Sequence, residues 1–494
     1  MLKLAAGMAL GLLAATAACV GPGSAVRLQT GPIRQHPENP HYLLFRGQPV
    51  VLVTSGEHYG AVVNPDFNFR RYLSTLAADG LNYTRIFTGA YIESPGAFGI
   101  RNNTLAPDGA RFLAPWGRSP IPGYRGGGNR FDLEQWDEGY FNRLQDFMVA
   151  ASELGIIVEV TLFSSYYGDF AGSPLHPDNN VNGVAAPPNE RQVQTLDNAG
   201  LLVHQERLVR KLVQELNGFD NVFFEIQNEP WADRPVTVMP INPFLLDWRN
   251  EWKNRVDLAD EASLRWQQRI AEVIQDEESR LPNRHLIAQN FCNFRYPLGE
   301  VPAAVSILNF HYAYPEAVAW NYGLDRVIGF DESGFSGSSD EVYRTQAWSF
   351  LLSGGGIFNH LDYSFYVGAE DGRGQNQAPG GGSPELRRQL GVLSRYLHSF
   401  DFLRMRPDSG AVVHASHAVA YCLAEPGRQY AVYLRGRGPT ELRLALPGGS
   451  YRAQWIAPET GSVLGAEDLV HPGGEAVLRS PTFEVDVALD LRGD

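Results

Sequence analysis

The sequence predicts an α/β fold in which a (β/α)8 TIM barrel precedes a small antiparallel β-sandwich. Eight short apolar segments alternate with helical periodicity between residues 49 and 400. The 494 residues suffice for a barrel of about 250 residues or more plus an accessory module. From Met405 onward, short alternating runs separated by Gly and Pro replace the helical pattern. We therefore expect a targeting segment at 1–25, the barrel at 26–404 and the sandwich at 405–494.

Residues 1–25 are predicted to be a signal peptide or lipoprotein signal. Lys3 is the positive flank, and the apolar stretch 4–18 is too short to span a bilayer comfortably. Thr16-Ala17-Ala18-Cys19 resembles a bacterial lipoprotein cleavage box, which predicts lipidation of Cys19, and cleavage near residues 23–25 is the alternative. Either route predicts an exported protein, lipid-anchored in the cell envelope or periplasmic or secreted, whose only membrane contact is that anchor.

The predicted barrel strands are short runs of β-branched and aromatic residues that end in polar or turn residues. They span 49–54, 81–87, 155–163, 221–227, 285–291, 305–311, 326–330 and 356–361. Helices are expected at 66–78, 133–154, 196–216, 339–352 and 384–400, and 243–280 is expected to be mainly helical. This alternation favours a closed barrel over a doubly wound sheet.

Two long insertions, at 88–132 and 168–193, are rich in Gly, Pro or Asn. Loops of that length within a compact domain are usually functional. We expect them to form the walls of a pocket-like site at the carboxyl ends of the strands. In the C-terminal part, sandwich strands are expected at 411–414, 429–433, 441–446, 451–456 and 482–491.

The composition excludes several classes of function. A formal net charge of −14 opposes binding to the phosphate backbone of a nucleic acid. The chain has no paired-Cys zinc pattern, no His-Glu-x-x-His motif and no phosphate loop, so we expect no metal and no cofactor. Cys292 and Cys422 fall in different predicted domains, which argues against a disulfide framework.

The stretch 223–231 carries the strongest functional signal. The apolar run 221–227 predicts a buried strand, and Pro230 ends it because proline cannot donate a ladder hydrogen bond. Glu229 therefore lies at the carboxyl tip of the fourth strand, and Glu332 lies at the tip of the seventh. Because these tips share one face of a barrel, we expect both carboxylates to face one cavity.

Asn228-Glu229-Pro230, together with Glu332, resembles the active-site pattern of clan A glycoside hydrolases, the retaining (β/α)8 barrels that include the cellulase-like family 5. The resemblance covers residues 49–400. It implies hydrolysis of β-glycosidic bonds by double displacement, with Glu229 as acid/base and Glu332 as nucleophile. Residues 450–455 and 458–461 resemble the C-terminal module of apiosidase-like proteins.

The resemblance also assigns roles to neighbours of the two carboxylates. Arg85 matches an arginine that hydrogen-bonds the nucleophile, and an ion pair with Glu225 is the alternative. Asn228 matches the position that binds the sugar 2-hydroxyl. Acid catalysis requires a raised pKa at Glu229, which we expect from burial and from the neighbouring negative charge.

The end of the sixth strand supplies further candidates. His311 is expected to donate a hydrogen bond in the site, and either Tyr312 or Tyr314 is expected to donate one to the nucleophile. Asp331, next to Glu332, is expected to face the opposite way and to be structural, because side chains alternate along a strand.

The remaining predicted substrate contacts are Glu57 and His58 after the first strand, Trp231 after the fourth and Tyr363 after the eighth. Residues 359–363 lack the Trp that many clan A members carry at the end of strand eight. The shape of the subsite for the cleaved sugar is therefore left open.

Three functions remain open at this stage, and each takes a carbohydrate partner. The first is the retaining β-glycosidase. The second is a non-catalytic surface carbohydrate-binding protein on a degenerate barrel, which the presence of both carboxylates argues against. The third is a barrel hydrolase of furanosides, which the apiosidase-like module suggests. The sequence predicts no particular sugar, linkage or oligomeric state.

Overall fold

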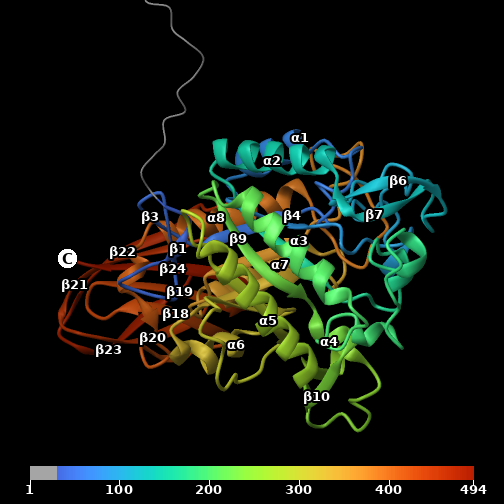
Figure 1. Ribbon diagram of the computed structural model, residues 1–494. Helices are drawn as coiled ribbons and strands as arrows, with labels where there is room; N and C mark the ends of the chain where they lie inside the picture. The colour runs from blue at the N-terminus through green and yellow to red at the C-terminus, as the bar shows by residue number, and fades with distance from the viewer. Residues whose placement is uncertain (1–30) are drawn as a thin grey trace, which may run out of the picture.

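The computed structural model describes residues 31–494 and confirms the predicted barrel (Figure 1). The predictions on residues 1–25, including lipidation of Cys19, lie outside the described residues. Eight parallel strands pair in the order β4-β15-β14-β13-β12-β9-β8-β5. The last and first meet where the Asn82 amide donates to the Val53 carbonyl at 3.3 Å. The strands are β4 (Leu52–Gly56), β5 (Tyr83–Phe87), β8 (Ile157–Ser164), β9 (Val222–Asn228), β12 (Ile287–Asn293), β13 (Ile307–His311), β14 (Val327–Ser333) and β15 (Ile357–Leu361).

Helices surround the barrel, and polar caps set where several of them begin. The side chains of Asn68, Asp137, Asp260 and Ser383 each accept a hydrogen bond from an amide in the first helical turn. The helices are α1 (Phe69–Ala78), α2 (Glu138–Glu153), α3 (Leu201–Leu216), α4 (Pro230–Asp233), α5 (Glu261–Glu278), α6 (Pro315–Asn321), α7 (Asp340–Leu351) and α8 (Pro384–His398). Within the described residues, none is long and apolar enough to cross a membrane.

Two of the sequence predictions about secondary structure are wrong. The stretch 243–280 is helical only from Glu261, and before it β10 (Pro235–Pro240) and β11 (Arg255–Ala259) form an antiparallel hairpin whose second strand joins β12. The hairpin carries Val236, Val238 and Val256, which favour strands. The insertion 88–132 also holds a hairpin, β6 (Trp116–Pro122) with β7 (Asn129–Trp136), so α2 begins after Asp137 rather than at residue 133.

A three-stranded sheet covers the amino end of the barrel. It comprises β1 (Arg34–Gln35), β2 (Leu43–Phe45) and β3 (Gln48–Val50), so the predicted strand 49–54 divides into β3 and β4. Leu43 and Phe45 pack with the first residues of the barrel strands, among them Tyr83, Phe223 and Ile307. This end of the barrel is therefore sealed by apolar contacts.

The C-terminal part contains two antiparallel sheets around a separate apolar cluster, which confirms the predicted sandwich. Its strands at 406–407, 418–425, 463–471 and 474–479 had not been predicted. One sheet contains β16 (Arg406–Pro407), β18 (Ala418–Glu425), β19 (Gln429–Gly436), β24 (Asp486–Gly493), β21 (Gly449–Ile456) and β22 (Val463–His471). The other contains β17 (Val412–Ala415), β20 (Glu441–Leu446) and β23 (Gly474–Arg479).

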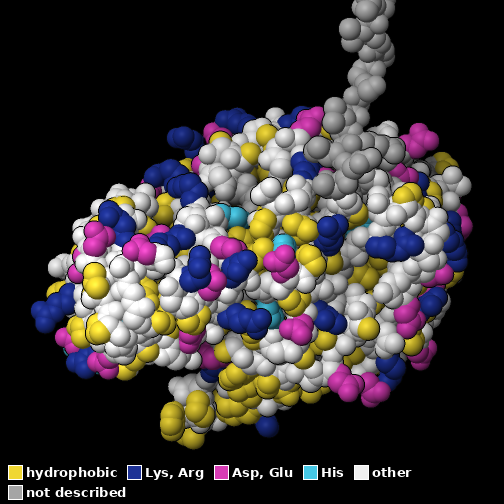
Figure 2. Space-filling model, turned by 90° about the vertical axis from the view of Figure 1, so that its left-hand side faces the viewer, with side chains coloured by type: hydrophobic (Ala, Val, Ile, Leu, Met, Phe, Trp, Pro, Cys, Tyr) yellow, Lys and Arg dark blue, Asp and Glu magenta, His cyan; other side chains and the backbone are white. Residues whose placement is uncertain are grey.

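The six-stranded sheet packs directly against barrel helices α7 and α8. Trp348 of α7 stacks on Tyr433 with ring centroids 5.3 Å apart. The buried Arg344 of α7 donates to the Asp486 carboxylate at 2.9 Å, and the Tyr396 hydroxyl of α8 donates to the Leu489 carbonyl at 2.6 Å. These contacts lie away from the carboxyl ends of the barrel strands, so the sandwich supports the barrel wall. Basic and acidic side chains are interspersed on the face shown in Figure 2.

Candidate active site

Strained backbone marks the carboxyl edge of the barrel. Five non-glycine residues at or just beyond strand ends have positive φ. Such residues cost free energy and persist where the surrounding structure holds them, which is common at functional sites. They are Tyr59 (60°), Tyr167 (53°), Glu229 (46°), Phe294 (62°) and Tyr312 (52°).

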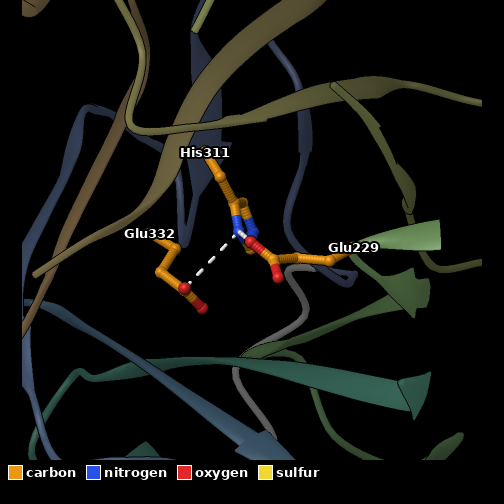
Figure 3. A group of neighbouring side chains, drawn as sticks. All are labelled: Glu229, His311 and Glu332. Carbon is orange, nitrogen blue, oxygen red and sulfur yellow. Dashed lines mark hydrogen bonds and ion pairs between the residues drawn. The ribbon is translucent and has the colours of Figure 1, made fainter. Parts of the chain in front are cut away.

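Glu229 and Glu332 face one another across the end of the barrel, and Figure 3 shows them with His311 between. One oxygen of each carboxylate and one ring nitrogen of His311 all lie within 4.8 Å of one another. Carboxyl groups about 5–5.5 Å apart suit a double displacement, whereas an inverting pair needs about 6.5–9.5 Å to admit a water. The two carboxylates thus approach one another at the carboxyl edge of the barrel.

His311, at the end of β13, is completely buried and surrounded by carboxylates. Its Nδ1 lies 2.8 Å from Glu229 Oε1 and 3.5 Å from Glu332 Oε1, and its Nε2 lies 3.4 Å from Asp331 Oδ2. Burial by itself lowers the pKa of His311. The charges of Glu332 and Asp331, and the hydrogen bonds of His311 to Asp331 and Glu229, raise this pKa well above its usual value. His311 is therefore an imidazolium that donates to Glu229.

The expectation of a raised pKa at Glu229 is wrong. Burial raises the pKa of Glu229, but the hydrogen bond and charge of His311 and the Tyr167 hydroxyl, 2.8 Å from Oε2, lower it more. The pKa of Glu229 therefore lies below its usual value, and the expectation failed because it did not include the charged partner His311. The hydrogen bond between His311 Nδ1 and Glu229 Oε1 is a path along which a proton can pass between the two groups.

Glu332 accepts hydrogen bonds from three side chains. The Tyr59 hydroxyl donates to Oε2 at 2.7 Å, Arg85 Nη1 donates to the same oxygen at 3.3 Å, and the Tyr312 hydroxyl donates to Oε1 at 2.8 Å. These donors orient the carboxylate. Of the two tyrosines proposed for this contact, Tyr312 makes it; Tyr314 instead stacks on Phe294, with ring centroids 5.7 Å apart.

Arg85 makes both of the contacts considered from the sequence. Besides Glu332, its guanidinium donates to the Glu225 carboxylate and, at 2.8 Å, to Asn228 Oδ1. Burial raises the pKa of Glu225 to about 7 although Arg85 opposes the shift. Glu159, also in the barrel interior, has a pKa well above its usual value, first through burial and then through Glu225. Arg85 thus links a buried acidic layer to the carboxylates above it.

Asp331 faces the barrel interior, so the expectation that it points away is wrong. The register of β13 against β14 pairs Phe310 with Phe330 but His311 with Glu332, which leaves Asp331 as the extra residue of a β-bulge. The bulge breaks the alternation of side chains. Asp331 Oδ2 consequently lies 3.6 Å from Arg85 Nη2 and beside His311.

A cavity of about 290 Å³ opens at this edge. Of the residues singled out from the sequence, His58, Asn228, Glu229, Trp231, Tyr312 and Glu332 line it. Arg85 and His311 lie behind that surface and act on the carboxylates. The other lining residues are Tyr59, Phe87, Tyr91, Glu93, Phe98, Tyr167, Ala232, Pro235, Trp252, Arg255, Asp257, Asn293 and Phe335.

Besides Arg85 and His311, three further predicted site residues do not line the cavity. The Glu57 carboxylate accepts the amides of Gly60 and Ala61, each at 3.0 Å, and so caps its own loop. Tyr314 lies outside, as described. Tyr363 is buried, and its ring centroid is 5.7 Å from that of His58. These three residues therefore have no direct access to a ligand in the cavity.

Tyr59 and Tyr167 were not predicted to bind the catalytic carboxylates, yet each hydrogen-bonds one of them. Both follow a buried strand directly, in the polar segments 55–59 and 164–167. That position is a usable signal, because the first residues after barrel strands line the site. Sequence alone did not show which member of each segment turns inward.

Two groups of donors in the described part of the chain have spacings that could hold a metal ion. They are Glu229, His311 and Glu332, and, deeper in the barrel, Glu159, Glu225 and Asp331. In the first group, Glu332 already accepts hydrogen bonds from the hydroxyls of Tyr59 and Tyr312. In the second group, the Arg85 guanidinium donates to Glu225. Protein donors thus balance these charges.

No protein-family model and no curated protein sequence matches the chain. Several solved structures do. They include a glycoside hydrolase family 5 protein from Bacteroides vulgatus ATCC 8482 with a TM-score of 0.59, 12% identity and 94% coverage of each chain. A second glycoside hydrolase has a TM-score of 0.56 and 12% identity, covering 94% of this chain and 97% of its own.

A further Bacteroides vulgatus protein, provisionally described as a glycoside hydrolase, has a TM-score of 0.61 and 11% identity, covering 95% of this chain and 84% of its own. At such identities the likeness establishes the fold, which this chain shares with family 5 glycoside hydrolases. The relation of the C-terminal sheets to apiosidase-like modules stays a prediction.

Proposed function

We propose that the protein is a retaining glycoside hydrolase that cleaves β-glycosidic bonds, with Glu229 as acid/base and Glu332 as nucleophile. The observation that carries the proposal is the approach of the two carboxylates to within 4.8 Å, at the ends of β9 and β14, in one cavity. The fold shared with glycoside hydrolases supports it.

In the first half-reaction, a Glu332 oxygen attacks the anomeric carbon while the bond from that carbon to the leaving-group oxygen breaks. Glu229 gives a proton to the departing oxygen, which yields an alcohol and a glycosyl ester on Glu332. In the second half-reaction, a water attacks the same carbon and Glu229 takes the water proton. Glu332 leaves as a carboxylate, and the sugar is released with its original anomeric configuration.

His311 supplies the proton for the first step. Its Nδ1 is 2.8 Å from Glu229 Oε1, so the proton can pass along an existing hydrogen bond. A sugar that fills the cavity displaces water from around this ion pair. Desolvation disfavours charged forms, so it favours a neutral imidazole beside a protonated Glu229. Substrate binding therefore favours the protonated form of Glu229, which acid catalysis requires.

We also propose export, on the grounds of Lys3 and the apolar stretch 4–18. Mass spectrometry of the mature protein tests this. The expected product lacks residues 1–18 and carries a diacylglycerol on Cys19. An N-terminus beginning near residue 26 without lipid would indicate ordinary signal-peptide cleavage, and an intact Met1 would refute export.

The catalytic proposal is tested with a panel of 4-nitrophenyl β-glycosides and the variant Glu332→Gln. We expect the wild type to release nitrophenol from at least one glycoside and the variant to be slower by roughly 10³-fold or more. Glu272→Gln, at a half-exposed surface glutamate, is the matched control and should retain full activity. A 2-deoxy-2-fluoro glycoside with a dinitrophenol leaving group should leave its sugar on the peptide containing Glu332.

Unchanged turnover in Glu332→Gln, or a fluoro-sugar adduct on another residue, would refute the assignment. Glycan binding without hydrolysis of any member of the panel would instead support the non-catalytic carbohydrate-binding alternative. The panel also includes aryl furanosides, and hydrolysis of these alone would support the third alternative, a barrel hydrolase of furanosides. The anomer formed first, observed by NMR, distinguishes retention from inversion.

A further inference from the structure

The two sides of the cavity differ in exposure. On the side of β4 and β5, the lining residues His58, Tyr59 and Glu93 are only 6%, 2% and 6% exposed. On the side of the β10–β11 hairpin, Trp252 is 38% exposed and Pro235 is also exposed. The cavity is therefore lined by buried side chains on the side of β4 and β5, with the half-exposed Phe98 at its edge, whereas Trp252 and Pro235 reach solvent on the hairpin side.

Hydrogen bonds between loops build the closed side. The loop after β5 joins the loop after β15, where the Arg101 amide donates to the Gln377 carbonyl at 2.9 Å. Beside this contact, the Asn376 side chain accepts from the Asn102 amide at 3.0 Å and donates to its carbonyl at 2.7 Å. The Gly337 amide, after β14, donates to the Pro379 carbonyl at 3.3 Å. The loops after the second, seventh and eighth barrel strands thus form one continuous wall.

An aromatic contact spans the mouth above the carboxylates. Phe98, from the loop after β5, and Phe335, from the loop after β14, meet edge to face with ring centroids 6.2 Å apart. Phe98 also meets Tyr167 at 5.2 Å, and Phe335 meets Tyr312 at 5.8 Å. A polysaccharide chain could not continue past this contact without separating the two loops.

The proposed chemistry gives the two sides different roles. Glu229 protonates the leaving-group oxygen, so the leaving group lies beside Glu229 and α4, toward the hairpin. The sugar attacked by Glu332 then lies toward His58 and Glu93 on the closed side. His58 lines the cavity on this side, and its Nε2 is held by Glu93 at 2.9 Å.

From this geometry we infer that the enzyme is exo-acting: it holds one terminal, non-reducing sugar against the closed wall and releases it as a monosaccharide. The inference rests on the proposed function. The cavity volume of about 290 Å³ agrees, because it lies just below the range of about 300–1,000 Å³ typical of small-molecule sites. A site for several consecutive sugars would need an open groove on both sides of the carboxylates.

The open side has the chemistry to hold the remainder of the glycan. Trp252 is an exposed indole whose other face stacks on Phe294, with ring centroids 6.0 Å apart. Arg255 and Asp257 of β11 form an ion pair of 2.8 Å at the cavity wall. Beyond them, the hairpin carries the exposed apolar residues Phe244 and Leu246. Hydrophobic side chains project at the bottom of Figure 2, the level at which Figure 1 places β10.

The test uses the nitrophenyl glycoside that the wild type hydrolyses in the panel, and the corresponding nitrophenyl β-disaccharide. An exo-acting enzyme releases monosaccharide first, so nitrophenol appears only after a lag. The same disaccharide methylated at the hydroxyl that would carry the next sugar should be hydrolysed at least tenfold more slowly. Immediate nitrophenol release together with free disaccharide, or undiminished hydrolysis of the methylated substrate, would overturn the inference.

Opening the wall provides a second, independent test. The double variant Phe98→Ala/Asn376→Ala should recover hydrolysis of the methylated disaccharide at least fivefold relative to the wild type. Val419→Ala, which removes an exposed apolar side chain of the C-terminal sandwich and lies away from the cavity, is the matched control and should leave the selectivity unchanged. Equal selectivity in the double variant and the wild type would show that these loops do not limit the substrate.

Failure of this inference can be told from failure of the proposed function. If no glycoside in the panel is hydrolysed, the proposed function fails, and the inference fails with it. If glycosides are hydrolysed and the Glu332→Gln variant is inactive, but disaccharide is released intact, only the exo mode of attack is wrong.

Discussion

The two ends of the barrel are built from the same strands but carry opposite kinds of side chains. At the amino end, Phe223 and Ile307 pack in an apolar cluster closed by the short sheet that contains β2. Six residues after Phe223, Glu229 follows the end of β9, and four residues after Ile307, His311 ends β13, both within a buried network of charges. Burial of apolar side chains at one end stabilises the folded state. This stabilisation offsets the cost of the buried charges and the strained backbone at the other end.

This comparison teaches that stability and reactivity are separated along the barrel axis. Between the ends lies a layer in which Arg85 contacts Glu225 and Glu332. This layer contributes to both stability and reactivity, because its charges are completely buried and also orient the candidate nucleophile. Substitutions at the three levels should therefore change stability and activity in different proportions.

Arg85→Met should have the largest effect. It leaves Glu225 and Glu332 buried without their cation, so we expect the free energy of unfolding to fall by about 3–5 kcal/mol and hydrolysis to become undetectable. Urea unfolding and nitrophenol release measure the two effects. Arg452→Met is the matched control: its pair with Asp468 in the sandwich is mostly exposed, and we expect a change within about 1 kcal/mol. Wild-type stability in Arg85→Met would contradict the charged-layer interpretation.

Phe223→Ala tests the amino end alone. The side chain is completely buried, so its removal should lower the free energy of unfolding by about 3–5 kcal/mol. The turnover number at temperatures where the variant remains folded should match that of the wild type. A loss of turnover without a loss of stability would show that the two ends are not independent.

Glu225→Gln tests the charged layer through its pH dependence. The pKa of Glu225 is raised from 4.5 to about 7, so between those values the folded protein keeps a proton that the unfolded chain has released. That stabilising contribution is fully present below pH 4.5 and is lost as pH rises through 7. The wild type should therefore lose about 3 kcal/mol relative to Glu225→Gln across this interval.

Urea unfolding of the wild type and Glu225→Gln at several pH values from 4.5 to 8.5 provides the measurement. The difference between the two proteins should change mainly between pH 4.5 and 7 and then become constant. A difference that does not depend on pH would mean that Glu225 is charged throughout the range in the folded protein.

Tyr59→Phe should have the smallest effect on stability and a measurable effect on activity. It removes a hydroxyl that donates to Glu332 at 2.7 Å, and a hydrogen bond to a charged group is worth about 1.5–3 kcal/mol. We expect kcat/KM to fall about 10- to 100-fold. Tyr314→Phe removes an equivalent hydroxyl outside the cavity and should change neither activity nor stability, and equal effects of the two would contradict the observed placement.

Several features of the site could be read from sequence because they depend on strand ends. Glu229 and Glu332 were identified because each follows a run of apolar residues, and barrel topology brings such ends to one face. Asp331 was misplaced because a β-bulge breaks the alternation that the prediction assumed. The hairpin 235–259 was missed because helical periodicity in α5 was extended too far toward the N-terminus.

The sequence by itself determined the alternation of strands and helices, the change to a sandwich, and which carboxylates stand at strand ends. These follow from periodicities of two and 3.6 residues and from proline, which act over short distances along the chain. Only the tertiary structure decided that His311 holds the proton beside Glu229, that Tyr59 and Tyr167 bind the carboxylates, and that loops from distant strands close one side of the cavity. Charge coupling and loop contacts join residues far apart in sequence, so no local pattern encodes them.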